Sequence, residues 1–261
     1  ALDVGIAENN MASVAAGLST YGYIPFISSF AAFATRNVAD QIYISVCYAK
    51  QNVKIIGSDP GIFVAKAGGT HMSFDDISIF RSFPDMVIFE PADAIELTQA
   101  IEQITDHYGP LYLRMPRGER PAVHDEQYRF DLFKADTLRS GSDVSILASG
   151  FMVEPSLRAA EQLKADGIDA EVINVHTIKP LDRETILASV KKTGKVITCE
   201  NHNVFGGLYS AVSELLCNAL PCKVETVAVY DQFGQVGLTH ELAVHYKLTS
   251  DEVVRKVKAM F

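Results

Sequence analysis

Residues 144–175 read VSILASGFMVEPSLRAAEQLKADGIDAEVINV, and this stretch decides the fold. It opens with the apolar run Val144–Ala148 and closes with a second apolar run, Ala170–Val175. Between the two runs, Leu157, Ala160 and Leu163 recur at the spacing of one helical face. A helix between two buried strands predicts a right-handed crossover that joins parallel strands.

The same alternation of strands and helices continues in both directions along the chain. Toward the C-terminus we expect strands at Val196–Cys199 and Val224–Val229, and a helix that carries Leu208, Val212 and Leu215. Toward the N-terminus the expected strands are Ile24–Ser28, Val53–Gly57, Met86–Phe89 and Leu111–Leu113, with a helix that carries Ala94, Leu97, Ile101 and Ile104. The sequence therefore predicts an α/β protein of two doubly wound domains with mainly parallel sheets. We expect the domains at residues 1–120 and 142–261, joined by a linker at 121–141 that is rich in charge, Gly and Pro.

Composition narrows the class of partner. A hydrophobic content of 48% with 21% charged residues is typical of a globular protein. The net charge of -9 argues against nucleic acid or an anionic membrane as the main partner, although a small anion needs only a few basic groups. The four cysteines lack the spacing of a metal site, and neither a signal peptide nor a long apolar run is present. We therefore expect reduced thiols and a cytoplasmic protein.

Polar residues follow two of the expected strands, where ligands of parallel α/β sheets usually bind. Ser58 comes directly after one strand, and Arg114 and Arg117 come after another. A guanidinium group suits the oxygens of a phosphate, a sulfonate or a carboxylate. Arg114 and Arg117 could equally well be exposed linker residues that bind no ligand.

Glu8 precedes a run of small and apolar residues that suits close helix packing. Burial would favour the protonated form of such a carboxyl, which could then share a proton with a ring nitrogen. A simpler interpretation is an exposed glutamate in the first turn of a helix. Of Phe30 and Phe33, one ring could stack on a flat heterocycle, but both also have the spacing of helical core residues.

His71 ends the motif Gly68-Gly69-Thr70-His71. The two glycines allow a tight turn and the close approach of a ligand. A histidine in such a turn could donate a hydrogen bond to a substrate hydroxyl or carry a proton, whereas most loop histidines are surface residues.

Taken together, the order and spacing of these motifs resemble the C-terminal portion of a transketolase, in particular the separately encoded smaller subunit of a split enzyme. The segments that carry the resemblance are Gly5 to Glu8, Pro25 to Phe33, Gly68 to His71, and Arg81 to Met86 leading into Glu90 to Asp93. Deoxyxylulose-phosphate synthases and the β subunits of 2-oxoacid dehydrogenases share parts of this pattern.

The resemblance implies a role for each candidate residue. Glu8 would protonate the aminopyrimidine ring of thiamine diphosphate, Phe33 would stack on that ring, and Phe30 would lie beside it. His71 would contact the reacting hydroxyls of the substrate. Ser58 and Arg117 would contact the anionic end of the substrate, with Arg114 as a second candidate. The reaction would cleave the C2–C3 bond of a ketose and transfer the two-carbon ketol unit to an aldose.

The resemblance also implies a partner. In the family the diphosphate and Mg²⁺ are held by another domain through a Gly-Asp-Gly motif and an Asn ligand, and the sequence contains no such motif. We therefore expect no metal ligands in this chain. The cofactor should lie at an interface with an N-terminal, diphosphate-binding subunit in an α2β2 heterotetramer, and this chain should be inactive alone. The second domain should support dimerisation, and further elements of the first domain should precede Ala1.

Three departures from the family pattern point to an unusual substrate. Ala67 stands where members usually carry the Asp that contacts the C2 hydroxyl of the acceptor. Ser58 and Asp59 stand where many members have a His that helps to bind phosphate, and Gly69 replaces a Pro or Ala. We therefore expect an altered donor or acceptor, such as a sugar that ends in a sulfonate.

Two other functions fit the same scaffold. The chain could be the β subunit of a 2-oxoacid dehydrogenase, which would need a lipoyl-domain partner, but the Gly-Gly-Thr-His turn fits that class less well. It could also be a non-catalytic interaction subunit. Retention of both Glu8 and Phe33 argues against the loss of catalysis.

Overall fold

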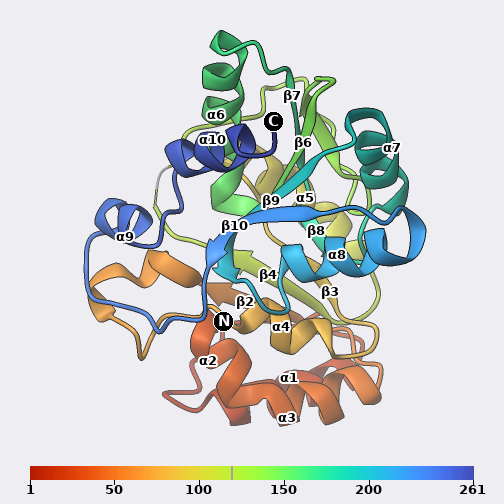
Figure 1. Cartoon of the computed structure of the whole chain (residues 1–261). Helices are drawn as coiled ribbons and strands as arrows, with labels where there is room; N and C mark the ends of the chain where they lie inside the picture. The colour runs from red at the N-terminus through yellow and green to blue at the C-terminus, as the bar shows by residue number, and fades with distance from the viewer. Residues whose placement is uncertain (119) are drawn as a thin grey trace.

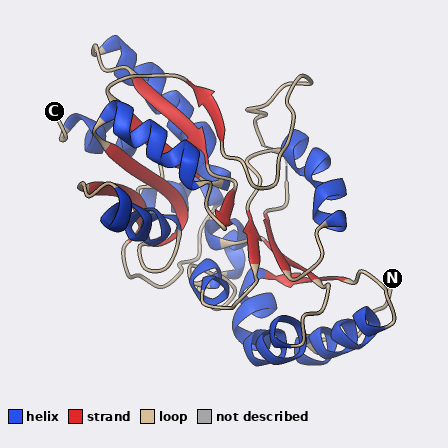
Figure 2. Ribbon diagram, turned by 90° about the vertical axis from the view of Figure 1, so that its right-hand side faces the viewer, coloured by secondary structure: helices blue, strands red, loops and turns tan. Residues whose placement is uncertain are grey.

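Two sheets flanked by helices form the molecule, as a computed structural model describes it for residues 1–118 and 120–261 (Figure 1). The first sheet has the strand order β1-β2-β4-β3-β8, and the second has the order β10-β9-β6-β7-β5. The first sheet contains β1 (Phe26–Phe30), β2 (Lys54–Ser58), β3 (Val87–Phe89), β4 (Leu111–Met115) and β8 (Thr177–Lys179). The second contains β5 (Asp136–Arg139), β6 (Val144–Ala148), β7 (Ala170–Asn174), β9 (Val196–Asn203) and β10 (Val224–Val229). Figure 2 shows the two sheets side by side, with the chain termini at opposite sides of the molecule.

Strand directions confirm the predicted fold class. Within each sheet the central strands pair in parallel, while β8 and β5 are antiparallel edge strands. Residues 144–175 contain β6, the helix α6 (Val153–Ala165) and β7, as predicted. Two strands were not predicted. β5 lies inside the expected linker, and β8 comes from the second half of the chain but completes the first sheet.

Helices cover both faces of each sheet. One face of the first sheet packs against α1 (Glu8–Thr20), the π-helical segment η2 (Ile42–Tyr48) and α4 (Asp76–Arg81), and the other face packs against α5 (Ala94–Asp106). The second sheet lies between α6 with α10 (Ser250–Lys258) on one side and α7 (Arg183–Thr193) with α8 (Leu208–Ala219) on the other. The remaining helical segments are α2 (Ala31–Thr35), η1 (Arg36–Val38), α3 (Ala39–Gln41), η3 (Gly61–Ala67), η4 (Gly150–Met152) and α9 (Thr239–His245).

Helix boundaries follow ordinary capping chemistry. The Asp93 side chain accepts the backbone N–H of Glu96 at 2.8 Å and so caps α5. Asp182 caps α7 in the same way through Thr185, and α7 ends at Gly194 in the left-handed region. In residues 1–118 and 120–261, no helix combines the length and apolar character that a membrane crossing requires.

Candidate active site

The carboxyl ends of three parallel strands bring most of the predicted site residues to one edge of the first sheet. Phe30, Ser58 and Met115 are register partners at the last positions of β1, β2 and β4. Arg117 lies two residues beyond β4, and Asp59 lies one residue beyond β2. We call this the open edge, because Ser58, Phe30 and Arg117 all keep solvent exposure there.

Glu8 is the first residue of α1 and reaches this edge through β1. Its Oε1 accepts a hydrogen bond from the Ser29 hydroxyl at 3.2 Å, and its Oε2 accepts one from the Asn37 side-chain amide, also at 3.2 Å. The carboxylate is half-buried, which lies between the buried and the exposed interpretations of the sequence, because one side of the first turn of α1 is uncovered in this chain. Two neutral donors therefore hold Glu8 in place while leaving it accessible.

Phe30, Phe33 and His71 form an aromatic cluster next to Glu8. The Phe33 and His71 ring centroids are 5.1 Å apart, and those of Phe30 and His71 are 5.9 Å apart. Phe30 and Phe33 meet edge to face with centroids 6.1 Å apart. All three side chains are half-buried, so the cluster offers partly exposed ring surface that a planar ligand could cover.

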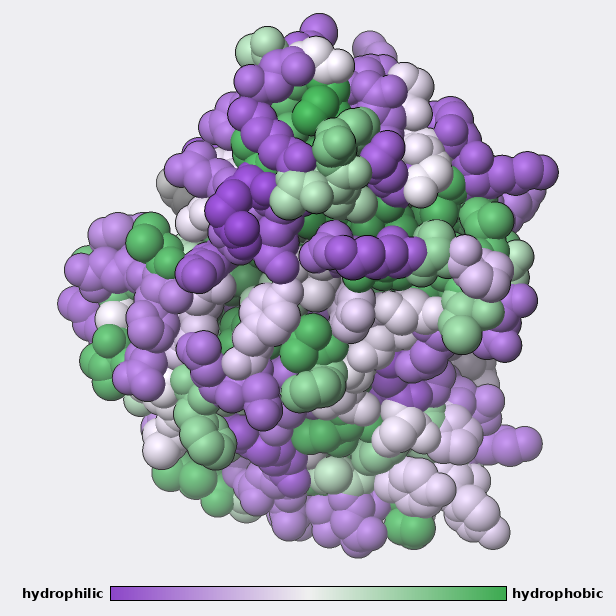
Figure 3. Space-filling model, viewed as in Figure 1, coloured by the Kyte–Doolittle hydropathy of each residue, from purple (hydrophilic) through white to green (hydrophobic). Residues whose placement is uncertain are grey.

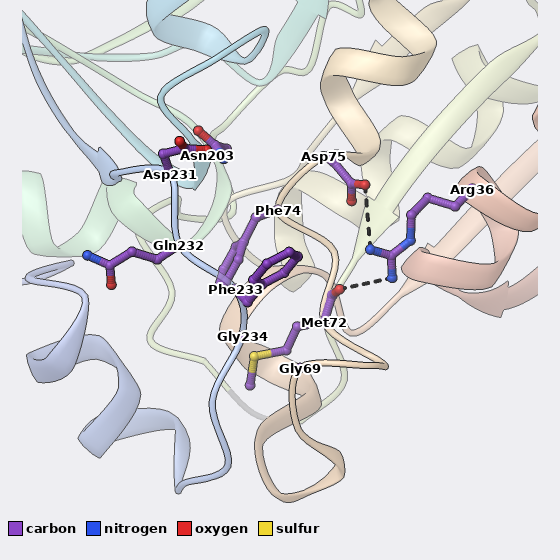
Figure 4. A pocket seen from close by; sticks show the side chains of 10 residues that line it. All are labelled: Arg36, Gly69, Met72, Phe74, Asp75, Asn203, Asp231, Gln232, Phe233 and Gly234. Atoms are coloured by element: carbon purple, nitrogen blue, oxygen red, sulfur yellow. Dashed lines mark hydrogen bonds and ion pairs between the residues drawn. The ribbon is translucent and has the colours of Figure 1, made fainter.

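The glycine turn that carries His71 packs against the second domain. A Cβ atom at Gly69 would collide with the backbone carbonyl of Gly234, in the loop between β10 and α9. This contact gives a structural reason why Gly69 replaces a larger residue. Figure 4 shows a pocket of about 140 Å³ beside Gly69, lined by residues of both domains. In it Arg36 pairs with Asp75 at 3.5 Å.

Arg117 is held by Asp59. The Arg117 backbone N–H donates to Asp59 Oδ1 at 3.0 Å, and its side-chain Nε donates to Oδ2. The Arg117 Cζ atom also lies 5.3 Å from the centroid of the Phe30 ring. Arg117 thus joins the aromatic cluster, with a side chain that is 68% exposed.

Arg114, by contrast, lies away from this edge. Its side chain is fully buried, with Nε 2.7 Å from Asp76 Oδ2 and Nη1 2.7 Å from Glu90 Oε1. Its Nη2 donates to the carbonyl of Asn201 in the second domain at 2.8 Å. The structure therefore corrects the expectation that Arg114 contacts substrate, because its donors are already committed to an ion-pair network between the domains.

Electrostatics support this structural role. Burial alone would raise the pKa of Asp76, but the ion pair and hydrogen bond with Arg114 override burial and hold that pKa below its usual value. Burial alone would lower the pKa of Arg114, and Asp76 and Glu90 instead raise it above its usual value. Asp76 and Arg114 are therefore both charged at neutral pH.

Sequence reasoning missed three side chains that support the site. Ser29 and Asn37 hold Glu8, and Asp59 holds Arg117. A signal for Asp59 was present, because it directly follows a strand whose neighbour ends near Arg117. No signal for Asn37 was available, because only the tertiary fold brings η1 next to α1.

Comparisons with known proteins place the chain in a family. Residues 1–122 match the model of the transketolase pyrimidine binding domain, and residues 133–253 match that of the transketolase C-terminal domain. The chain is 51% identical over 255 residues to the 6-deoxy-6-sulfo-D-fructose transketolase subunit SqwH of Clostridium sp. (strain MSTE9), covering 98% of this chain and 79% of the relative. It is 38% identical over 258 residues to a putative transketolase C-terminal section of Methanocaldococcus jannaschii, covering 98% of this chain and 81% of that protein.

A solved structure agrees with these sequence relatives. It is a split-gene transketolase described as an inactive β4 tetramer, which superposes with a TM-score of 0.91 at 40% identity over 99% of this chain and 82% of its own. The match extends through both sheets, and the resemblance noted from the motifs is confirmed. This chain belongs to the transketolase family and corresponds to the C-terminal subunit of a split transketolase.

Proposed function

We propose that this subunit takes part in the transfer of a two-carbon ketol unit from a ketose that ends in a sulfonate to an aldose. The observation that carries the proposal is the open edge, where a carboxylate, an aromatic cluster and one exposed guanidinium lie together. The relative at 51% identity is named for a sulfonated ketose, which supports the choice of anion.

The residues at this edge fit the aminopyrimidine half of thiamine diphosphate. Glu8 is half-buried and accessible, and its two hydrogen-bond partners keep it beside the partly exposed rings of Phe30 and Phe33. When bound, the cofactor supplies the chemistry that breaks the carbon–carbon bond next to the ketose carbonyl. Glu8 holds a proton at a nitrogen of the pyrimidine ring, Phe33 packs on the face of that ring, and Phe30 lies beside it.

The other candidates act on the substrate. His71 donates a hydrogen bond to the substrate hydroxyls, and the turn that carries it is braced by the contact of Gly69 with Gly234. Ser58 lies between Phe30 and Met115 at the strand ends, where its hydroxyl contacts the same end of the substrate as Arg117. The terminal nitrogens of Arg117 bind the sulfonate oxygens.

The diphosphate and Mg²⁺ are held by a partner subunit in an α2β2 assembly. Across the described parts of the chain, no three His, Cys, Asp or Glu side chains form a group that could hold a metal. Large apolar side chains are exposed on and near α1 and η2, including Tyr21, Tyr23 and Tyr48, and Figure 3 shows further apolar surface near α9. Such exposed apolar surface supports an interface with the partner subunit.

The four cysteines of the chain are free thiols, which supports the predicted cytoplasmic location.

The test compares two donors of the same carbon skeleton, 6-deoxy-6-sulfo-D-fructose and D-fructose 6-phosphate. The chain is co-expressed with its diphosphate-binding partner, and ketol transfer to an aldose is measured with thiamine diphosphate and Mg²⁺. We expect a higher kcat/KM for the sulfonate, and no turnover by the chain alone. Equal kcat/KM for the two donors, or turnover without the partner, would contradict the proposal.

A further inference from the structure

Asp59 lies beside Arg117, under the proposed anion site. It adopts a left-handed backbone with φ of 50°, a conformation that, apart from glycine, mainly Asn and Asp adopt and that persists where the surroundings fix it. Its backbone N–H donates to the carbonyl of Met115 at 3.0 Å. The residue is thereby fixed between the ends of β2 and β4.

The Asp59 carboxylate is directed at one residue. Its side chain is only 4% exposed, and both of its oxygens accept hydrogen bonds from Arg117, one from the backbone and one from Nε. The Nε side of the guanidinium is therefore occupied. Nη1 and Nη2 of Arg117 make no hydrogen bond to any described residue, so this outer part of the group is available to an anion.

The pair presents little net charge to a ligand. Arg117 contributes one positive charge and Asp59 one negative charge a few ångströms further from the ligand. A phosphate ester carries nearly two negative charges at neutral pH, whereas a sulfonate carries one. Arg117 attracts a phosphate about twice as strongly as a sulfonate, and the carboxylate behind it repels a phosphate about twice as strongly. The presence of Asp59 therefore weakens the binding of a phosphate more than that of a sulfonate.

Resting on the proposed function, we propose that Asp59 is a specificity-determining residue that positions Arg117 and selects a terminal monoanion, such as a sulfonate, over a phosphate dianion. Arg114, three residues before Arg117, shows a different use of carboxylates, because Asp76 and Glu90 together accept hydrogen bonds from all three of its guanidinium nitrogens. At Arg117 the single carboxylate of Asp59 leaves Nη1 and Nη2 of the guanidinium free but lowers the effective positive charge of the guanidinium.

The test removes the carboxylate charge in two ways that the backbone tolerates. Asp59→Asn keeps an oxygen that can accept the Arg117 N–H, and asparagine tolerates the left-handed region. Asp59→Gly removes the side chain at a backbone angle that suits glycine. The matched control is Asp166→Asn, which removes one negative charge and one surface ion pair, with Lys258 at 2.7 Å, in the second domain.

Each variant is assembled with the partner subunit, thiamine diphosphate and Mg²⁺, and kcat/KM is measured for 6-deoxy-6-sulfo-D-fructose and D-fructose 6-phosphate. The ratio of the phosphate value to the sulfonate value should rise about tenfold in both Asp59 variants, chiefly through KM, and stay unchanged in the control. A ratio within about twofold of the wild-type ratio would overturn the inference, even if both activities fell. A wild-type enzyme that used neither ketose would overturn the proposed function and the inference together.

Discussion

Arg114 and Arg117 lie three residues apart and have opposite surroundings. Arg114 is inside β4, fully buried, and gives its donors to Asp76, Glu90 and the second domain. Arg117 is beyond the end of the same strand, 68% exposed, and paired with a single carboxylate. Arg114, inside the strand, therefore joins the two domains. Arg117, just past the carboxyl end of the strand, can contact a ligand.

This difference extends to the regions around the two residues. The buried network around Arg114 links the domains and should govern stability. The open edge around Arg117 keeps partly exposed rings and a held carboxylate and should govern activity. Substitutions in the two regions should therefore affect different measurements.

The largest effect is expected at the open edge for Glu8→Gln. This change keeps the shape of the side chain but removes the exchangeable proton, so kcat should fall by about 10³-fold. The assembly and its unfolding midpoint should not change, because Glu8 is half-buried and makes only two hydrogen bonds. Glu102→Gln on the exposed side of α5 is the control. Retention of more than about a tenth of the activity would show that Glu8 is not a catalytic residue.

The next largest effect is expected in the buried network for Arg114→Met. It leaves Asp76 and Glu90 buried without their cation, which should lower the free energy of unfolding by about 3–5 kcal/mol. Urea denaturation of the purified subunit measures this loss, with Arg117→Met as the matched control. We expect a smaller loss of about 1–2 kcal/mol there, because only one carboxylate loses its cation and Asp59 keeps the hydrogen bond from the Arg117 backbone N–H. Similar losses for both variants would erase the distinction between the two regions.

A smaller effect concerns the pH dependence of stability at Glu200, which accepts the backbone N–H groups of Leu208 and Tyr209 at 2.7 and 2.8 Å. Burial raises the pKa of Glu200 to about 7 from an ordinary value of 4.5. Its contribution to stability is therefore complete below pH 4.5 and is lost as pH rises through 7. Nearby, burial lowers the pKa of His202 to about 4, so the contribution of His202 is present above pH 6.5 and is lost as pH falls through 4.

Glu200→Gln isolates the first of these contributions. Variant and wild type share His202, so the difference in their unfolding free energies, variant minus wild type, should rise by about 2–3 kcal/mol between pH 4.5 and 7. Denaturant titrations at several pH values in that window measure the difference. A difference that is flat with pH would show that Glu200 stays ionised in the folded protein.

The smallest effect is expected for Arg117→Met on activity. The change keeps an apolar stem over Phe30 but removes a charge-assisted hydrogen bond to the anionic end of the donor, so kcat/KM should fall about 30-fold through KM. With an uncharged ketose the same variant should lose less than about threefold. Equal losses of kcat/KM with both donors would show that the anionic end of the donor does not bind at Arg117.

The sequence was most informative where the local pattern and the fold agree. Val144–Ala148 and Val224–Val229 are strands with the predicted bounds, because buried parallel strands are continuous apolar runs. β8 and β5 were missed because each is a short antiparallel edge strand with one apolar residue, Ile178 in β8 and Leu138 in β5. Such strands are specified by the neighbour they pair with.

The same limit applies to the site. Residues at strand ends, such as Arg117 and Ser58, could be proposed because the carboxyl ends of parallel strands share one edge. The burial of Arg114 could not be predicted, because its partners Asp76 and Glu90 come from a helix and a loop that only the tertiary fold brings together. Chain position alone did not distinguish the two arginines.

If this chain supplies half of a thiamine diphosphate site, its presence must change how tightly the cofactor binds. Calorimetric titration of thiamine diphosphate with Mg²⁺ tests this directly, for this chain alone, for its diphosphate-binding partner alone and for the two mixed in equal amounts. We predict saturable binding for the mixture, at least about tenfold tighter than for the partner alone, and none for this chain by itself. Equal affinity for the mixture and the partner alone, or no binding by the mixture, would contradict the account.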